Sequence, residues 1–475
     1  MIILVGSKID QSTIQASLGK SEYSYFFLLK EFLPALEQVG EVVVVKDTDE
    51  VAALTARYRS EGKAVVFLSF SPPHQVPLDL PCPTVAVFAW EFDSLPSISA
   101  AEAAQATPGD WHSNPRNDWS HVFARVAGTI ATSCEAAALV ERSGDGRFPV
   151  IALPAPIWAR YDDVCPEQGW PLEMGRRSFS FAGQVIDSRA LALNAEDVAH
   201  RPVSEAKRIS KALLQGWWHE MRLPKAIAGE SLLMPPPLAP QAEPILVDGV
   251  VYTTVLNPAD GRKNWVDIVS AFCWAFKNEP EATLIVKMTH HDINLYRGVL
   301  LTLLARLSPF RCRVLVLHGF LQDEEYLQLI QASTFYVNAS SGEGLCLPLM
   351  EFLCCGKPAI APRHTAMADY LYEDFAFIVR TCLEPSCWPH DPTGKLLTHS
   401  NRLNWQSLME AYRTSYSTVR TATAYQHMSF AARNAMHRFC SLERVSNELG
   451  SFLQQVASSE HSNMQTDSSG QGLNA

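Results

Sequence analysis

Short apolar runs rich in β-branched residues alternate with helical patterns along most of this chain. The first 160 residues hold six such runs, each short enough for a buried strand: IILVG, EVVVVKD, AVVFLSF, TVAVFAW, TIATS and PVIALP. A helical pattern near residues 22–39 separates the first two. Strands separated by helices predict a parallel sheet with helices on both faces.

The same pattern restarts at VVYTTVLN, residues 250–257. Its later strands are TLIVKMT, RVLVLHG, TFYVNAS and PAIAP, with helices predicted at 265–277, 299–307 and 323–331. The sequence therefore predicts an α/β protein with two Rossmann-like domains facing a central cleft. A chain of 475 residues is also too long for one ordinary core.

We place the first domain at residues 1–160 and the second at 246–440. Residues 161–245 are interpreted as a linker or insertion, and 441–457 as a C-terminal helix. The remaining 458–475 are rich in Ser, Gln and Gly, which predicts a disordered tail.

Composition excludes several functional classes. A net charge of −11 argues against nonspecific nucleic-acid binding. The sequence also has no apolar run of eighteen residues, the length that would predict a membrane-spanning helix. MIILVGSK is typical of a first strand and not of a signal peptide. The eleven cysteines form no C-x-x-C pair, which favours reduced, mostly buried thiols in a cytoplasmic protein.

Residues 201–225 carry six basic side chains against two acidic ones, together with a pair of tryptophans. One interpretation is a peripheral contact with the inner membrane face or an anionic acceptor. The other, which we favour, is a solvated linker helix whose tryptophans pack on a domain.

Two glutamates lie in the apolar stretch SSGEGLCLPLMEFLCCGKPAIAP, residues 340–362. Glu343 falls on a tight loop after a predicted strand. Glu351 falls on the first turns of a helix that Pro348 begins and Gly356 ends. Such a loop leading into a helix is a site for phosphate, and carboxylates there suit hydroxyls of a sugar and a ribose. The alternative is a surface glutamate and a dipole-compensating glutamate, but an apolar helix seldom buries an unpaired carboxylate.

These residues resemble glycosyltransferase family 4. The motif S-x-E-G-x-x-L-P-x-x-E-x-x-x-x-G-x-P-x-I-A is similar to the family's E-x7-E signature, strongly over residues 250–375 and weakly over the first 160. The resemblance implies a GT-B fold and a retaining, metal-independent enzyme that uses sugar nucleotides. It further implies that Glu343 faces the donor sugar, that Glu351 binds the ribose, and that Gly344 and Leu345 offer backbone N–H groups.

The segment LNPADGRKNW (256–265) follows the first strand of the second domain, where the family carries cations for the diphosphate. Lys263 matches the family lysine. Asn257 replaces the usual arginine, so we expect Arg262 to supply that charge and help the leaving diphosphate. The alternative is an exposed, solvated pair of charges.

Other positions depart from the family or match it less specifically. Cys346 stands where many members have glycine, so the loop path there is expected to differ. His364 is interpreted either as a donor-phosphate contact or as a structural histidine. Gly19, in SLGKSE, is the candidate for the first domain's phosphate loop, although the sequence lacks the first glycine of a Walker motif.

The segment VFAWEFDSLP (87–96) resembles the W-E-x-D-x-L-P loop of some family members. It implies an acceptor-side role for Glu91 and Asp93, which could orient a hydroxyl there. A plain surface turn is the alternative.

The sequence therefore predicts a retaining glycosyltransferase with a nucleotide-diphosphate sugar as donor and a glycan, lipid or protein as acceptor. No cofactor and no metal are expected. Two alternatives stay open: a GT-B phosphorylase or epimerase, and a protein that binds a sugar nucleotide without turnover.

Overall fold

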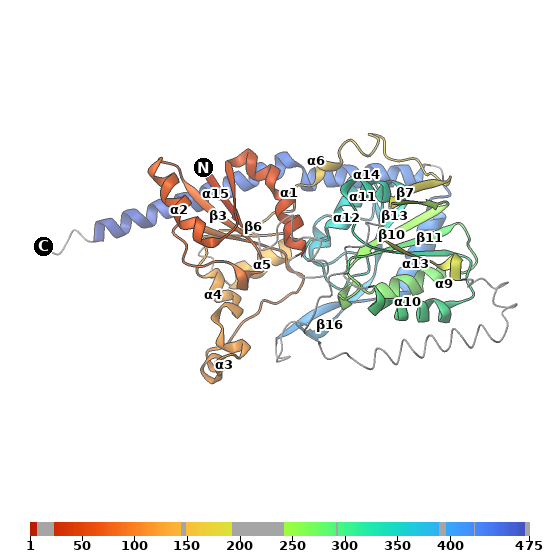
Figure 1. Cartoon of the computed structure of the whole chain (residues 1–475), viewed down its shortest axis with the longest axis horizontal. Helices are drawn as coiled ribbons and strands as arrows, with labels where there is room; N and C mark the ends of the chain where they lie inside the picture. Colours follow the sequence, from red (N-terminus) through yellow and green to blue (C-terminus); the bar gives the residue numbers. More distant parts are fainter. Residues whose placement is uncertain are drawn as a thin grey trace, which may run out of the picture.

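The computed structural model describes residues 1–6, 23–143, 149–191, 242–290, 293–388, 396–421 and 423–470. Two α/β domains lie side by side, the first in red to orange and the second in green to blue (Figure 1). The α/β class and the pair of Rossmann-like domains of a GT-B architecture are thus confirmed. Gly19 and residues 201–225 lie outside the described residues, so their roles stay predictions.

The first domain is built on a six-stranded parallel sheet. All six predicted strands are present. In spatial order they are β2 (Glu41–Val45), β1 (Ile2–Gly6), β3 (Val65–Phe70), β4 (Thr84–Phe88), β5 (Gly128–Ala131) and β6 (Val150–Ala152). Its helices are α1 (Tyr23–Val39), α2 (Thr48–Ser60), α3 (Ala100–Gln105), α4 (Trp119–Phe123), α5 (Cys134–Ser143) and α6 (Trp158–Tyr161).

The second domain has a seven-stranded sheet, parallel except for one edge strand. Its spatial order is β15 (Ala376–Val379), β14 (Ala359–Pro362), β13 (Phe335–Val337), β10 (Val250–Leu256), β11 (Ala282–Met288), β12 (Arg313–His318) and β8 (Gln184–Asp187). Its helices are α9 (Trp265–Ala275), α10 (Asn294–Leu307), α11 (Asp323–Ala332), α12 (Leu347–Cys354) and α13 (Trp405–Thr418).

Part of the segment interpreted as a linker belongs to the second domain. The strand β8 pairs antiparallel with β12, and an ion pair of 2.8 Å joins Arg313 to Asp187. A further ribbon pairs β7 (Arg177–Phe181) with β9 (Glu243–Val247). Second-domain structure therefore begins well before residue 246. The sequence did not reveal this because these edge strands are short and half-exposed.

Two long helices follow the second domain: α14 (Ala424–Cys440) and α15 (Leu442–Gly470). In Figure 1, α15 runs back along the first domain. A Cβ on Gly128 would lie 2.9 Å from the Phe452 ring, so only glycine at this point of β5 admits the helix so closely. The sequence predicted disorder from residue 458, but the helix continues to Gly470. No proline or glycine interrupts residues 451–469, so nothing in this stretch ends the helix earlier.

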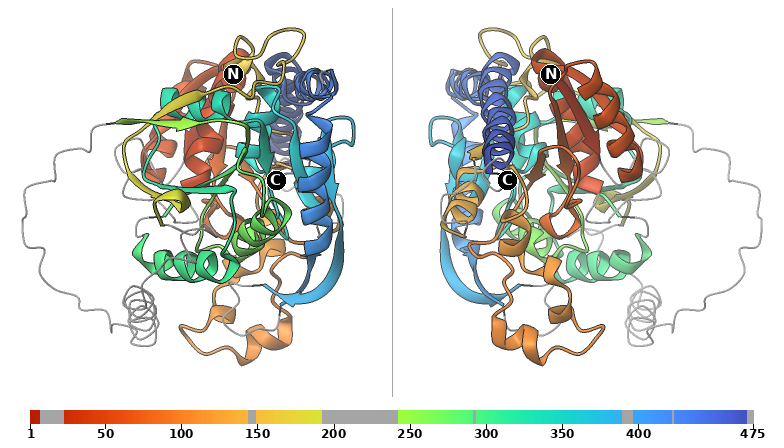
Figure 2. Two further views of the ribbon diagram at one scale, coloured as in Figure 1. Left: turned by 90° about the vertical axis from the view of Figure 1, so that its right-hand side faces the viewer. Right: turned by 90° about the vertical axis from the view of Figure 1, so that its left-hand side faces the viewer.

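A hairpin of β16 (Thr381–Cys387) and β17 (Leu397–Leu403) projects from the second domain beside α3 and α4 of the first (Figures 1 and 2). The eleven cysteines are all free, and all but Cys134, Cys382 and Cys387 are buried. Within the described residues, no helix is both long and apolar enough to cross a bilayer.

Candidate active site

The second sheet changes direction between β10 and β13. The chain runs outward from β10 to β11 and β12, then returns to β13 on the other side of β10. Ligands of open α/β sheets bind beyond the carboxyl ends of the strands at such a point. The loops after β10 and β13 meet here, where the Ser341 N–H donates to the Arg262 carbonyl at 2.9 Å.

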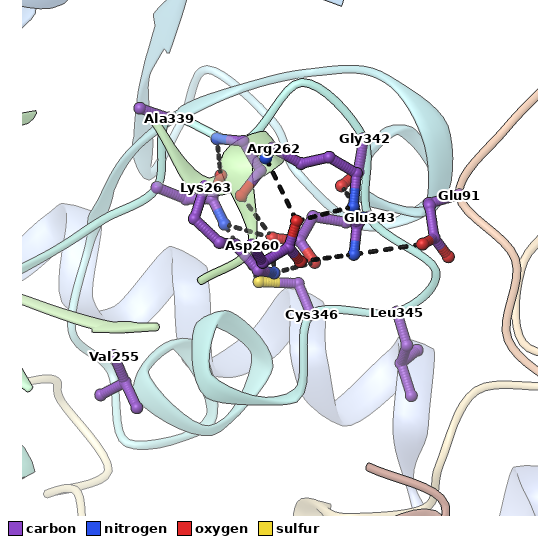
Figure 3. A network of polar contacts seen from close by, with 12 residues as sticks. Glu91, Val255, Asp260, Arg262, Lys263, Ala339, Gly342, Glu343, Leu345 and Cys346 are labelled. Atoms are coloured by element: carbon purple, nitrogen blue, oxygen red, sulfur yellow. Dashed lines mark hydrogen bonds and ion pairs between the residues drawn. The ribbon is translucent and has the colours of Figure 1, made fainter. Parts of the chain in front are cut away.

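Lys263 and Glu343 form a largely buried ion pair at this meeting point, with side chains 19% and 5% exposed (Figure 3). The Lys263 Nζ donates to Oε1 and Oε2 of Glu343 at 2.7 and 2.8 Å. Asn338 Nδ2 and Ser340 Oγ also donate to Oε1, at 3.0 and 2.6 Å. The two motifs therefore meet in the fold, and the carboxylate is held in one orientation by Lys263 and by groups on its own loop.

The cations decide the charge state of Glu343, which is only 4% exposed. Burial would raise its pKa, but the charges of Lys263 and Arg262 and the hydrogen bonds outweigh burial and hold the pKa at about 2. Burial lowers the pKa of Lys263, and the Glu343 charge more than compensates, so its pKa is raised. Both groups are therefore ionised at neutral pH.

Arg262 joins the two domains. Its guanidinium donates to the Gly342 carbonyl at 2.7 Å and to Asp260 Oδ2 at 2.7 Å. It also forms an ion pair of 3.1 Å with Glu91 of the first domain. Burial raises the pKa of Glu91, while Arg262 and Lys263 act against that rise. The geometry gives Arg262 a bracing role beyond the charge that the sequence predicted.

The loop carrying Glu343 packs directly on the first domain. A Cβ on Gly342 would lie 2.7 Å from the Glu91 carbonyl, and one on Gly344 would lie 2.9 Å from the Trp90 nitrogen. Thr132 Oγ1 also donates to the Gly344 carbonyl at 2.6 Å. Glycine is required at both positions because any side chain would separate the domains.

Glu351 lies on α12, and two tyrosines hold its carboxylate. Tyr161 donates to Oε1 at 3.1 Å and Tyr326 donates to Oε2 at 2.7 Å. Burial raises the pKa of Glu351, whereas these hydrogen bonds and the charge of Arg160 act to lower it. As predicted, Pro348 lies in the first turn of α12 and Gly356 follows its end with a φ of 66°.

Three residues other than glycine adopt the left-handed backbone conformation around this site. They are Asn264, Cys346 and Thr365, with φ of 49°, 63° and 48°. The Thr365 conformation is costly for a β-branched residue, and its hydroxyl compensates by accepting from the Glu343 N–H at 3.0 Å. Cys346, where the family has glycine, keeps a left-handed backbone, and its Sγ accepts from Asn338 at 3.2 Å.

His364 precedes this strained residue and is 9% exposed. Its Nδ1 lies 3.3 Å from the Thr365 hydroxyl, and its Nε2 is buried with no hydrogen-bond partner among the described residues. Burial lowers its pKa to about 4, although the Glu343 charge acts against that. The imidazole is therefore neutral at pH 7, next to the ion pair.

Replacing His364 with asparagine should flatten the dependence of stability on pH. Because its folded pKa of about 4 lies below the ordinary histidine pKa of 6.5, the stability it contributes is complete above pH 6.5 and is lost as pH falls to 4. Between those values the wild type should lose up to about 3 kcal/mol more than the variant. Urea unfolding at pH 7 and pH 4.5 measures this; parallel curves would exclude the buried neutral imidazole.

The other predicted residues are spread around the site. Asn257 directly follows β10 and accepts from the Ala259 N–H at 3.0 Å. The Leu345 carbonyl accepts from the Tyr370 hydroxyl at 2.9 Å. Asp93 points to the β16–β17 hairpin, where it accepts from the Thr398 hydroxyl at 2.7 Å and from the His399 Nδ1 at 2.7 Å. The donor and acceptor roles of these residues stay predictions.

Sequence reasoning missed the groups that hold the two glutamates, Asn338, Ser340, Tyr161 and Tyr326. It also missed Lys287, which is 3% exposed near the end of β11, and burial lowers its pKa to about 7. A lysine inside the apolar run TLIVKMT was a visible signal. In the described part of the chain, no cluster of three or more His, Cys, Asp or Glu side chains is arranged to hold a metal ion.

No protein-family model matches the chain, and no curated protein matches its sequence. Among solved structures, HepE of Anabaena in complex with UDP and glucose is 10% identical, with a TM-score of 0.48 over 96% of this chain and 100% of that one. Sucrose-phosphate synthase from Thermosynechococcus elongatus is 12% identical, with a TM-score of 0.48 over 97% and 100%. The pneumococcal O-GlcNAc transferase GtfA, in complex with UDP and GlcNAc, is 12% identical, with a TM-score of 0.41 over 86% and 60%. Because these similarities are distant, we base the function proposed below on this chain's own residues.

Proposed function

We propose that the chain is a retaining, metal-independent glycosyltransferase that uses a nucleotide-diphosphate sugar. The observation that carries the proposal is the Lys263–Glu343 ion pair at the switch point of the second sheet, with Glu351 on the helix that follows. An ionised carboxylate and a cation at the carboxyl ends of parallel strands suit a ligand with sugar hydroxyls and phosphates.

The contacts of Lys263 and Glu343 leave room for both the sugar and the diphosphate of the donor. Only Lys263 donates to Oε2 of Glu343 in the described residues, and a carboxylate oxygen accepts more than one hydrogen bond. A sugar hydroxyl can therefore donate to Oε2. The Lys263 ammonium has three donors, of which Glu343 takes two. The third is available to the diphosphate, whose departing charge Lys263 would stabilise.

The donor reaches this pair only when the domains separate. Glu343 is nearly inaccessible while Gly342 and Gly344 pack on residues 89–91. We infer that the arrangement described above is a closed one and that opening admits the sugar nucleotide. Closure around a donor would exclude water from the glycosyl group and so favour transfer over hydrolysis.

A thermal-shift screen of UDP-, GDP- and ADP-sugars tests the donor class. A ligand at one hundred times its dissociation constant should stabilise the fold by about 2.7 kcal/mol. We expect one base to stand out. If no sugar nucleotide stabilises the protein at millimolar concentration, the proposed function is wrong.

Glu351→Gln should weaken nucleotide binding by roughly 1.5–3 kcal/mol, because the ribose hydroxyls would lose a charged acceptor. Tyr326→Phe is the matched control, since it removes one hydrogen bond to Glu351 and keeps the carboxylate. Calorimetry with the nucleotide alone provides the measurement. If Glu351→Gln lowers stability but leaves the affinity unchanged, Glu351 only connects Tyr161 and Tyr326.

One observation favours a second candidate, a protein that binds the sugar nucleotide without turnover. The guanidinium of Arg262 is already occupied by Asp260, Glu91 and the Gly342 carbonyl, and Asn257 carries no charge. Lys263 would then be the main cation left for the diphosphate. Donor binding without release of the nucleotide, with any acceptor or water, would identify this candidate. Phosphate-dependent cleavage or donor epimerisation would identify the phosphorylase or epimerase.

A further inference from the structure

Residues 96–123, between β4 and β5, form an arm that extends from the first domain and contains α3 and α4 (Figure 1). The arm lines an open cavity of about 600 Å³. This is within the roughly 300–1,000 Å³ typical of small-molecule sites. The wall combines polar and apolar groups: His112, His121, Asp118, Ser113, Ile98 and Pro115.

A series of aromatic contacts connects this cavity with the candidate active site. Trp90 contacts the loop that carries Glu343, and its ring centroid lies 5.8 Å from that of Trp388, at the end of β16. Trp388 lies 6.2 Å from Trp111 on the arm, and Trp111 lies 5.2 Å from His112 in the cavity wall. Trp111 and Trp388 are both half-buried.

The second domain holds this path in place. Asp93 accepts from Thr398 and His399 of β17, and Ser94 Oγ donates to the Leu397 carbonyl at 3.0 Å. These contacts fix the hairpin beside the base of the arm (Figure 2). The aromatic series therefore crosses from one domain to the other in a fixed arrangement.

We propose that the arm cavity, with Trp111 and Trp388, is a distal subsite for a glycan chain whose end reaches the candidate active site. The proposal rests on the proposed transferase function. Sugar rings offer C–H faces that pack on aromatic rings and hydroxyls that bond to imidazole, carboxylate and hydroxyl groups. None of the residues lining the cavity is a lysine or arginine, which disfavours a phosphorylated lipid headgroup. The acceptor is then an oligosaccharide and not a single sugar.

Calorimetry with gluco-, manno- and galacto-oligosaccharides of one to six units tests this on the full chain. At least one series should bind more tightly as it lengthens. Trp111→Ala removes an aromatic face, and Ala103→Phe fills the cavity without removing a polar group. Each variant should bind the longest oligosaccharide of that series about tenfold more weakly, the loss expected for one aromatic contact. Gln105→Ala, at the exposed end of α3, is the matched control and should bind as wild type.

Thermal shift with the donor separates this subsite from the donor site. Both arm variants should keep the wild-type shift, since the arm does not form the switch point of the second sheet. The subsite is refuted if no oligosaccharide binds more tightly than its monosaccharide, or if both variants bind the longest member as wild type does. If no sugar nucleotide shifts the melting temperature of the wild type, the proposed function is contradicted instead.

Discussion

Lys263→Ala lowers donor turnover by about a hundredfold or more, the usual cost of losing a group that stabilises developing charge. The reason is that its ammonium, held by Glu343 at 2.7 Å, provides positive charge where the diphosphate would leave. Binding of the bare nucleoside should change far less, because that part of the donor does not carry the departing charge. Single-turnover release of the nucleotide from a donor found by the screen measures the effect.

The control for this variant is Lys277→Ala, which removes an exposed lysine just after α9 in the same domain. It should turn over the donor at the wild-type rate. Lys263→Ala also leaves the buried Glu343 carboxylate without its cation, so the stability of the variant must be measured by denaturant unfolding. A slow but folded Lys263→Ala separates lost catalysis from lost structure.

Glu343→Gln destabilises the protein by about 3–5 kcal/mol, because breaking a buried ion pair leaves Lys263 uncompensated. The double variant Lys263→Met/Glu343→Gln should recover much of that loss, since neither charge is then buried alone. Denaturant unfolding of the single and double variants measures the coupling. If the loss of stability in the double variant equals the sum of the losses in the two single variants, the two side chains do not stabilise one another.

The same pair gives the stability a defined dependence on acid. The folded pKa of Glu343, about 2, lies below the ordinary glutamate pKa of 4.5, so the stability it contributes is complete above pH 4.5. It is lost as pH falls from 4.5 toward 2, where the carboxylate takes up a proton. Glu343→Gln should show no such loss in this range.

Much of this arrangement could be predicted from local sequence. Buried strands of the two sheets are continuous apolar runs, so their positions followed from length and β-branched content. Lys263 and Glu343 could be placed together because each follows a strand whose carboxyl end lies at the same edge. Pro348 and Gly356 marked the ends of α12 by the same local rules.

The remaining features depend on contacts between distant parts of the chain. Tyr161 contacts Glu351 across 190 positions, and Asp93 contacts His399 across 306. No local pattern encodes such pairs, because each partner sees only its own helix or turn in the sequence. The ion pair between Arg262 and Glu91 likewise exists only once the two domains are in contact.

Release of the nucleotide by four proteins tests the central claim most directly: wild type, Lys263→Ala, Glu343→Ala and the control Lys277→Ala. We predict that the control matches wild type, and that the two site variants are each at least about a hundredfold slower while still binding the nucleoside. If both site variants release the nucleotide at the wild-type rate, Lys263 and Glu343 do not form the active site.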